Sequence, residues 1–398
     1  MKITLMTERL LEAVAKLGVV TSSKDELVIS IEVFAKNFMD KDGTTCVKNV
    51  VSMKVFNGKT QVASSLIAES AELDSASVCV TVGYEFIAVV TAVGKGGAQL
   101  TTIEINNSNV VVKSGVSSVT LAKKTEGIAP IAFDLSDKST IEGVYEVSRK
   151  ELKEAVDRVV VSVDSDSSDV CPGISFFPSK DKLIIRSANH MMMTQAECTV
   201  LKYKSSDGTG DIKMFATLAR MFRTILASAS ADVIRIYKTT LHVIVQFDMQ
   251  FWQLPLLNSL VTEEVFKKII SMPRPTTVTV DKTALLNAIG VVLASYKESK
   301  DRLLALSCEG GCVMVANADK TASTAIAPKN MEGEFEESCL NVTFIKNILG
   351  SIKTNDVTIC FGDGRTPLSL RDCDADKTVS FIAKIDREQY EKSMKSNK

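Results

Sequence analysis

Two patterns of apolar and polar residues alternate along the chain. In the first, apolar residues recur every three or four positions, as in the run of Leu10, Leu11, Val14 and Leu17 that ends at Gly18, and this spacing is typical of an amphipathic helix. The second is a strict alternation interrupted by polar turns, which predicts antiparallel strands. Six segments are predicted to be helices: 7–17, 83–93, 148–163, 215–228, 281–300 and 341–353. The predicted fold class is therefore α+β.

Two of the predicted helices have capping residues at their first turn. Ser148 with Glu151 forms a capping-box pattern, in which each side chain bonds the other's backbone N–H. Asn341 precedes the last helix, where its side chain can accept the free N–H groups of the first turn. We expect both helices to begin at these residues.

The helices fall into three pairs, each followed by strands, so the chain is predicted to be a loose threefold repeat. The predicted joints lie near 130–138 and near 272–277, the second containing the Pro-rich sequence Met272-Pro273-Arg274-Pro275. The predicted domains are 1–133, 134–274 and 275–398. Long internal repeats favour an array over a catalytic cleft.

Composition is that of an ordinary globular protein, with 45% hydrophobic and 24% charged residues. No apolar run is long enough to span a membrane, and the first residues alternate like a strand, unlike a signal peptide. The nine cysteines are scattered without paired spacing, which favours reduced thiols and a cytoplasmic location.

Formal net charge is −1, which by itself argues against nucleic-acid binding. Basic residues nevertheless outnumber acidic ones on the predicted helices, and the strands and loops carry the compensating negative charge. Helices that face DNA would show this division. A general preference of charged residues for exposed helix faces explains the division equally well.

Enzyme signatures are mostly missing. The sequence has no phosphate-binding loop, H-E-x-x-H or C-x-x-C motif, so no catalytic residue, metal or cofactor is predicted. An enzyme that uses the His190 turn or the acidic Asp164–Asp169 loop remains an alternative. A β-rich adhesion protein is a second alternative, which predicts a secretion signal.

Three segments resemble the bacterial β sliding clamp family, in the order in which the family has them. Residues 99–121 resemble the end of the first clamp domain, residues 174–190 the strand pair and turn of the middle domain, and residues 340–370 the helix and strands of the last domain. The resemblance implies three clamp domains, each with two helices packed on antiparallel sheets, and a head-to-tail homodimeric ring. It also implies a processivity factor without chemistry of its own.

The implied partners are double-stranded DNA bound without sequence preference, a DNA polymerase and an ATP-dependent clamp loader. Phosphate contacts are expected from basic residues on or beside the helices. These DNA-channel candidates are Lys16, Lys24, Lys95, Arg149, Lys150, Lys153, Arg220, Arg223, Lys297, Lys346 and Lys353.

The family binds short peptides in a cleft between its middle and last domains. Carried over to this chain, the cleft residues are Cys171, Pro172, Ser187, Asn189, His190, Met191, Met192, Ile269, Ile270, Met272, Pro273, Phe381, Ala383 and Ile385. The family's D-G-H-R-L turn is Ala188-Asn189-His190-Met191-Met192 here, and the chain continues past the family's usual end to Lys398. These departures favour a distant member, of phage or plasmid origin, with a different peptide preference.

The family's dimer joins the first domain of one subunit to the last domain of the other through sheet edges. Mapped here, the edges are expected at 117–124 and 302–308. The predicted interface residues are Ser118, Val119, Leu121, Leu304 and Leu306.

Overall fold

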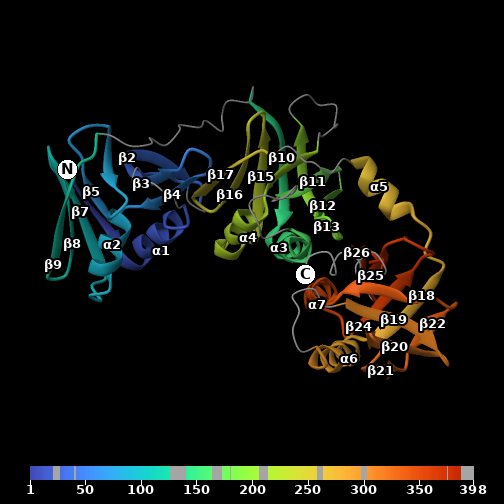
Figure 1. Ribbon diagram of the computed structural model, residues 1–398. Coiled ribbons are helices and arrows are strands. Elements are labelled where there is room, and N and C mark those ends of the chain that lie inside the picture. Colours follow the sequence, from blue (N-terminus) through green and yellow to red (C-terminus); the bar gives the residue numbers. More distant parts are fainter. Residues whose placement is uncertain are drawn as a thin grey trace. The chain divides into compact units, whose positions relative to one another are not determined.

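The computed structural model describes residues 1–20, 27–39, 42–125, 140–163, 173–179, 181–205, 214–257, 263–296, 303–373 and 375–386. The chain forms two compact units, one holding Met1–Glu146, Lys202–Gly210 and Ser228–Leu256 and the other the remaining residues. Figure 1 labels the helices and strands of both units. Helices and antiparallel strands make up both units, so the α+β class is confirmed. None of the described helices is long and apolar enough to cross a membrane.

The elements follow one another in the same order three times. Each round has a strand, a helix, three or more strands, a second helix and three closing strands. The first round is β1 Lys2–Met6, α1 Thr7–Leu17, β2 Val28–Met39, β3 Thr45–Phe56, β4 Gln61–Ile67, β5 Ser70–Glu72, β6 Ser77–Gly83, α2 Phe86–Gly94, β7 Leu100–Ile105, β8 Asn109–Ser114 and β9 Ser117–Ala122.

The second round is β10 Ile141–Ser148, α3 Arg149–Val159, a 3₁₀ turn Val160–Ser162, β11 Gly173–Pro178, β12 Lys182–Ala188, β13 Met192–Ser205, β14 Phe215–Leu218, α4 Ala219–Ser228, β15 Val233–Thr239, β16 His242–Phe247 and β17 Gln250–Pro255. An additional helix, α5 Glu263–Ser271, follows it. The third round is β18 Thr276–Asp281, α6 Lys282–Ala294, β19 Leu303–Glu309, β20 Cys312–Asn317, β21 Ser323–Ile326, β22 Asn330–Glu332, β23 Ser338–Asn341, α7 Val342–Ser351, β24 Asp356–Phe361, β25 Leu368–Asp372 and β26 Ala375–Ile382. The repeat is thus visible in the structure, and the exact domain boundaries stay predictions.

The first unit contains two sheets. One has the order β5-β1-β7-β8-β9, and the other runs β6-β2-β3-β4-β17-β16-β15. Backbone pairing between β4 and β17 therefore joins the first round of elements to the second. We call this pairing the first joint.

In the second unit, one sheet runs β14-β11-β12-β13-β26-β25-β24-β18-β22, and β13 pairs with β26 over five residue pairs. We call the β13–β26 pairing the second joint. A separate sheet has the order β21-β20-β19-β23. The helices α6 and α7 pack against strands of both sheets, and their Leu285, Ile289, Ile345 and Ile348 are fully buried in one apolar core.

The predicted helices at 7–17, 281–300 and 341–353 are present as α1, α6 and α7. Asn341 accepts a hydrogen bond from the Thr343 N–H at 2.9 Å, and Asp281 accepts one from the Ala284 N–H at 2.8 Å, so α7 and α6 begin beside these residues. The capping box was wrong: Ser148 makes no side-chain cap bond, and the Glu151 carboxylate accepts the Thr199 N–H at 2.9 Å instead. The Glu151 carboxylate therefore bonds the backbone of the neighbouring strand β13 instead of the first turn of its own helix.

Two further helix predictions need correction. The segment 215–218 is strand β14, because its N–H and C=O groups pair with β11. The helix α5 was missed, although Phe266, Ile269 and Ile270 have helical spacing. Its short length hid that signal among the strand patterns.

Candidate functional site

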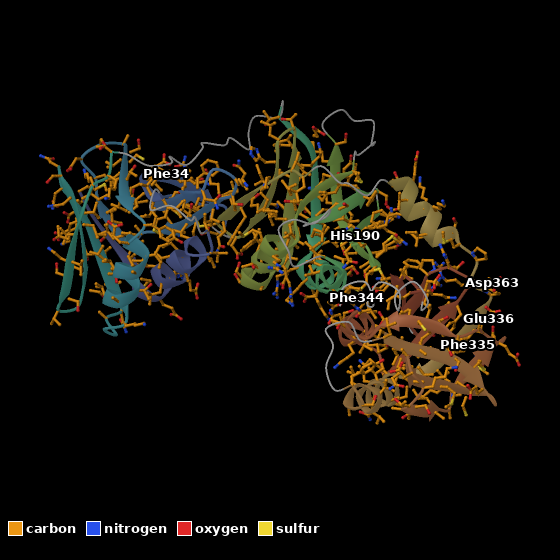
Figure 2. The ribbon with its side chains drawn as sticks, viewed as in Figure 1. Phe34, His190, Phe335, Glu336, Phe344 and Asp363 are labelled. Carbon is orange, nitrogen blue, oxygen red and sulfur yellow. The ribbon has the colours of Figure 1, made fainter. Side chains whose placement is uncertain are left out.

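The predicted His190 turn joins β12 to β13 and carries an apolar cluster. The Asn189 side chain accepts hydrogen bonds from the N–H groups of Met191 and Met192, at 2.9 and 2.7 Å. The backbone therefore turns tightly, and His190 is exposed at its tip (Figure 2). The methionines that follow lead from the turn toward β26 and the core.

A hollow of about 260 Å³ lies beside this turn, entirely within the second unit. One wall is β13 and β26, where Met193 is paired with Phe381 and the Ala383 N–H donates to the Met191 carbonyl at 2.8 Å. The helix α5 contributes another wall. Eleven residues line the hollow: Ala188, Asn189, His190, Met191, Met192, Met193, Val265, Ile269, Pro367, Phe381 and Ala383. The hollow, which we call the His190 hollow, is mostly apolar and suits the apolar side chains of a peptide.

The helix α5 is held on the sheet by a buried arginine. The guanidinium of Arg186 lies 4.3 Å from the ring centre of Phe177 and 5.1 Å from that of Phe266, a residue of α5. Its Nε donates to the Gln195 side chain at 2.7 Å. Burial lowers the pKa of Arg186 below its ordinary value. Stacking of this kind fixes the face that α5 turns toward the hollow.

A second arginine ties the walls together. The guanidinium of Arg274 donates to the carbonyls of Pro367 (2.8 Å), Met272 (2.8 Å) and Ile269 (3.0 Å). It also lies 4.7 Å from the ring centre of Phe381. Three segments of the His190 hollow are thereby held by one side chain, a role that was not predicted from the sequence.

The structure brings half of the predicted cleft residues together. Asn189, His190, Met191, Met192, Ile269, Phe381 and Ala383 line the hollow. Four further lining residues were missed: Ala188, Met193, Val265 and Pro367. Cys171 and Pro172 lie outside the described residues.

The remaining predicted cleft residues lie elsewhere. Ser187 is buried and donates to the Val159 carbonyl at the end of α3, so it faces away from the hollow. Ile270 packs into the adjacent core around Phe266. Met272, Pro273 and Ile385 are near the hollow in sequence but do not line it.

The DNA-channel candidates differ in their surroundings. Lys95, Lys150, Arg220, Arg223, Lys346 and Lys353 are exposed, whereas Lys16, Arg149 and Lys153 are half-buried. Three of them already pair with carboxylates of α3: Asp157 accepts from Lys153 at 2.6 Å and Arg223 at 2.8 Å, and Glu154 pairs with Lys353 at 3.0 Å. Lys24 and Lys297 lie outside the described residues. Lys150 and Lys346 are therefore the better candidates in the second unit, since no described carboxylate pairs with either.

The structure adds no support for an enzyme. No group of three or more His, Cys, Asp or Glu side chains that could hold a metal occurs among the described residues. The Asp164–Asp169 loop lies outside them. Apart from Asn189, whose side chain accepts the Met191 and Met192 N–H groups, the residues that line the hollow with His190 are apolar.

No family model and no curated protein matches the sequence. Solved structures match over its length: the DNA polymerase III subunit beta from Pseudomonas aeruginosa has a TM-score of 0.79 at 14% identity, covering 97% of this chain and 100% of that one. The sliding clamp from Bacillus subtilis gives 0.78 at 14%, and the beta subunit from Thermotoga maritima 0.76 at 15%, each covering 97% of this chain and 99% of the other. The chain has the sliding-clamp fold.

Within this fold, the predicted dimer edge at 302–308 needs correction. Strand β19 pairs with β20 on one side and β23 on the other, so it has no free edge. Leu304 and Leu306 are fully buried in the core. The continuous apolar run Leu303-Leu304-Ala305-Leu306, buried on both faces, was the signal of an interior strand.

Two other strands of the clamp fold do have free edges. Strand β9 pairs only with β8, and β21 pairs only with β20, among the strands that the structure describes. At the first joint β4 pairs with β17, and at the second β13 pairs with β26, so both joints unite the same two positions of the repeat. In the third round, β21 has the position of β4 and β13, and in the first round β9 has the position of β17 and β26.

Proposed function

We propose that the protein is a DNA sliding clamp: a head-to-tail homodimer that encircles duplex DNA in the cytoplasm and tethers a DNA polymerase to it. The observation that carries the proposal is the clamp fold over 97% of the chain. The protein does no chemistry in this role, because a closed ring is held on DNA by topology. A chain without a nucleotide-binding loop would need a separate ATP-dependent loader to open the ring.

Free strand edges support ring closure. An unpaired strand edge can pair with a strand of another chain. If β9 of one copy paired with β21 of the other, both edges would be removed, and the pairing would join the same two positions of the repeat as the two joints do. Ser118 and Val119 of β9 and Thr324 of β21 are the residues proposed for this contact. Leu121, a residue of β9 whose side chain is buried, would support the contact from beneath.

Light scattering tests the dimer, which should have twice the 43.2 kDa mass of one chain. Thr120→Pro combined with Ala325→Pro should give folded monomers, because each proline removes an N–H group that points to the free edge, away from β8 or β20. Electron micrographs of the unmodified protein should show particles with an open centre. Compact particles without a hole would contradict the proposal.

Weak phosphate contacts would let such a ring slide. Lys150→Glu with Lys346→Glu should weaken association with nicked circular DNA and lower the salt slope by about two, roughly one for each phosphate that is no longer neutralised. Lys268→Glu on α5 is the matched control and should leave the slope unchanged. An equal slope for both variants would remove α3 and α7 from the DNA interface.

The His190 hollow is proposed to bind a short linear peptide of the polymerase, through apolar anchors. Val265, 45% exposed at its rim, allows a test that spares the core. Val265→Asp should cost about 2 kcal/mol or more of affinity for peptides tiled across the polymerase encoded with this protein. Val291→Asp on α6, where the valine is 54% exposed, is the control and should bind normally.

A further inference from the structure

A second hollow, of about 390 Å³, lies in the first unit beside the first joint. Alternate residues of β2 and β3 line it, together with residues of β4, β16 and β17. Phe34, Val50 and Phe251 supply apolar surface, and Phe34 is marked on β2 in Figure 2. Lys36 and Lys54 stand at its rim. We call this region the Phe34 surface.

The surface continues onto a two-stranded ribbon. Strand β2 pairs with β6 only as far as Phe34, and β3 pairs with β4 only from Val50 onward. Beyond these residues, β2 and β3 pair only with each other, up to Met39 opposite Thr45. Because side chains alternate along a strand, Phe38 and Lys48 share the face of Phe34. The ribbon therefore enlarges the hollow with an aromatic ring and a further cation.

Two cations on the ribbon have no carboxylate partner in the part of the chain that the structure describes. Lys36 and Lys48 are directly opposite each other in the β2–β3 register, and their ammonium groups lie 5.9 and 6.0 Å from the ring centre of Phe38. No described Asp or Glu is within ion-pair distance of either, whereas the neighbouring Lys54 pairs with Glu32 at 2.9 Å. Like charges directly opposite each other are destabilising. The chain as a whole has a net charge of −1, so this pair is a local concentration of positive charge. An anionic partner would neutralise it.

We propose that the Phe34 surface is a second docking site, for a segment of a partner protein with an apolar or aromatic residue flanked by acidic residues. The apolar side chain lies between Phe34 and Phe251, and the carboxylates lie over Lys36 and Lys48. The proposal goes beyond polymerase tethering and does not depend on the His190 hollow, which is built from other residues in the other unit.

Single-stranded nucleic acid is the other chemistry with a negative charge and flat apolar groups. It fits less well, because the cations of this surface gather at one point, where Lys36 and Lys48 are opposite each other. Nucleic-acid grooves present a track of cations along the strand rather than one pair. The charge pattern thus favours an acidic peptide.

The test uses a fluorescein-labelled peptide with a central Phe-Leu and Asp on both sides, titrated against the full-length protein by fluorescence polarisation. Binding should weaken on the order of tenfold in Lys36→Glu with Lys48→Glu, since two attractions become repulsions. A peptide with Lys in place of Asp should bind this reversed variant better than it binds the unmodified protein. Phe34→Ala should weaken both peptides, and Val265→Asp should change neither.

Absence of binding by the acidic peptide would overturn the proposal, as would binding that the lysine reversal leaves unchanged. Tighter binding of oligo(dT) than of the peptide, abolished in the same variant, would make the surface a nucleic-acid site and would also overturn it. The titration requires neither DNA nor dimer closure. Its result therefore stays interpretable even if the ring or DNA tests of the proposed function fail.

Discussion

The first and second joints are both antiparallel pairings of the same two positions of the repeat, yet their side chains differ. At the first joint Gln253 is opposite Gln61, and both are buried. At the second, Met193 is opposite Phe381. Backbone pairing is thus the feature that the two joints share, and the side chains decide what surface each joint presents.

A second difference lies in what covers each joint. The helix α5, seated by Arg186, forms a wall of the His190 hollow beside the second joint. The first joint has an open hollow bordered by the β2–β3 ribbon and its lysines. We therefore expect apolar anchoring at the second joint and charge-assisted docking at the first.

Removing the largest side chain from each joint should have the largest effect. Trp252 and Phe381 are 0% and 2% exposed, so Trp252→Ala and Phe381→Ala should each lower the free energy of unfolding by about 3–5 kcal/mol. Urea denaturation measures this decrease. Only Phe381→Ala should also abolish peptide binding in the His190 hollow, at a temperature where both variants are folded. An equal decrease of peptide affinity in Trp252→Ala would show that the joints are coupled.

Arg274 is expected to have the next largest effect. Arg274→Ala leaves three carbonyls without their donor and should cost about 2–3 kcal/mol of stability, with weaker peptide binding. Arg274→Lys should recover part of both. Arg365→Ala, in which an arginine 84% exposed is removed, is the control and should change stability by less than about 0.5 kcal/mol. Normal peptide binding in Arg274→Ala would mean that the hollow's walls hold their positions without it.

The same substitution should have opposite signs at the two joints. The Gln253 side-chain oxygen is buried and has no hydrogen-bond partner among the described residues, so Gln253→Leu should stabilise the protein by about 1 kcal/mol. The Gln195 oxygen accepts from Arg186, so Gln195→Leu should destabilise it by about 1–2 kcal/mol. Thermal unfolding compares the two variants. Reduced stability in both would contradict the proposed difference in polar satisfaction.

Local signals in the sequence were enough for much of the fold. Apolar periodicity identified α1 and α6, and periodicity together with the Asn341 cap identified α7. Gly310 and Gly311, which both have positive φ, form the two-residue turn between β19 and β20. Such signals depend only on residues that are close together in the sequence. The order of the strands within a sheet depends on residues that are far apart, which is why the strand with Leu304 was wrongly predicted to be a sheet edge.

The site was predicted where a turn carried it and missed where distant segments met. Asn189 and His190 lie in one turn, so the resemblance could identify them together. Val265 and Pro367 come from segments far apart in the chain, which Arg274 brings together through three carbonyls. Hydrogen bonds from an arginine to backbone carbonyls cannot be predicted from the hydrophobic pattern or from the spacing of residues, because every residue has a carbonyl.

The smallest expected effect concerns Glu151, which anchors β13 from α3. The hydrogen bond from the Thr199 N–H lowers the pKa of Glu151 below its ordinary value. The stabilisation is therefore present above the unfolded-state pKa, about 4.3, and is lost as the pH falls through the folded-state pKa. Glu151→Gln keeps an acceptor but removes the charge, so it should be less stable than the unmodified protein by under about 1 kcal/mol at neutral pH and equal to it in acid. Glu151→Ala should remain less stable in acid.

Urea denaturation at a series of pH values measures these differences in stability. If Glu151→Gln differed from the unmodified protein by the same amount at every pH, the charge of the carboxylate would contribute nothing to holding β13.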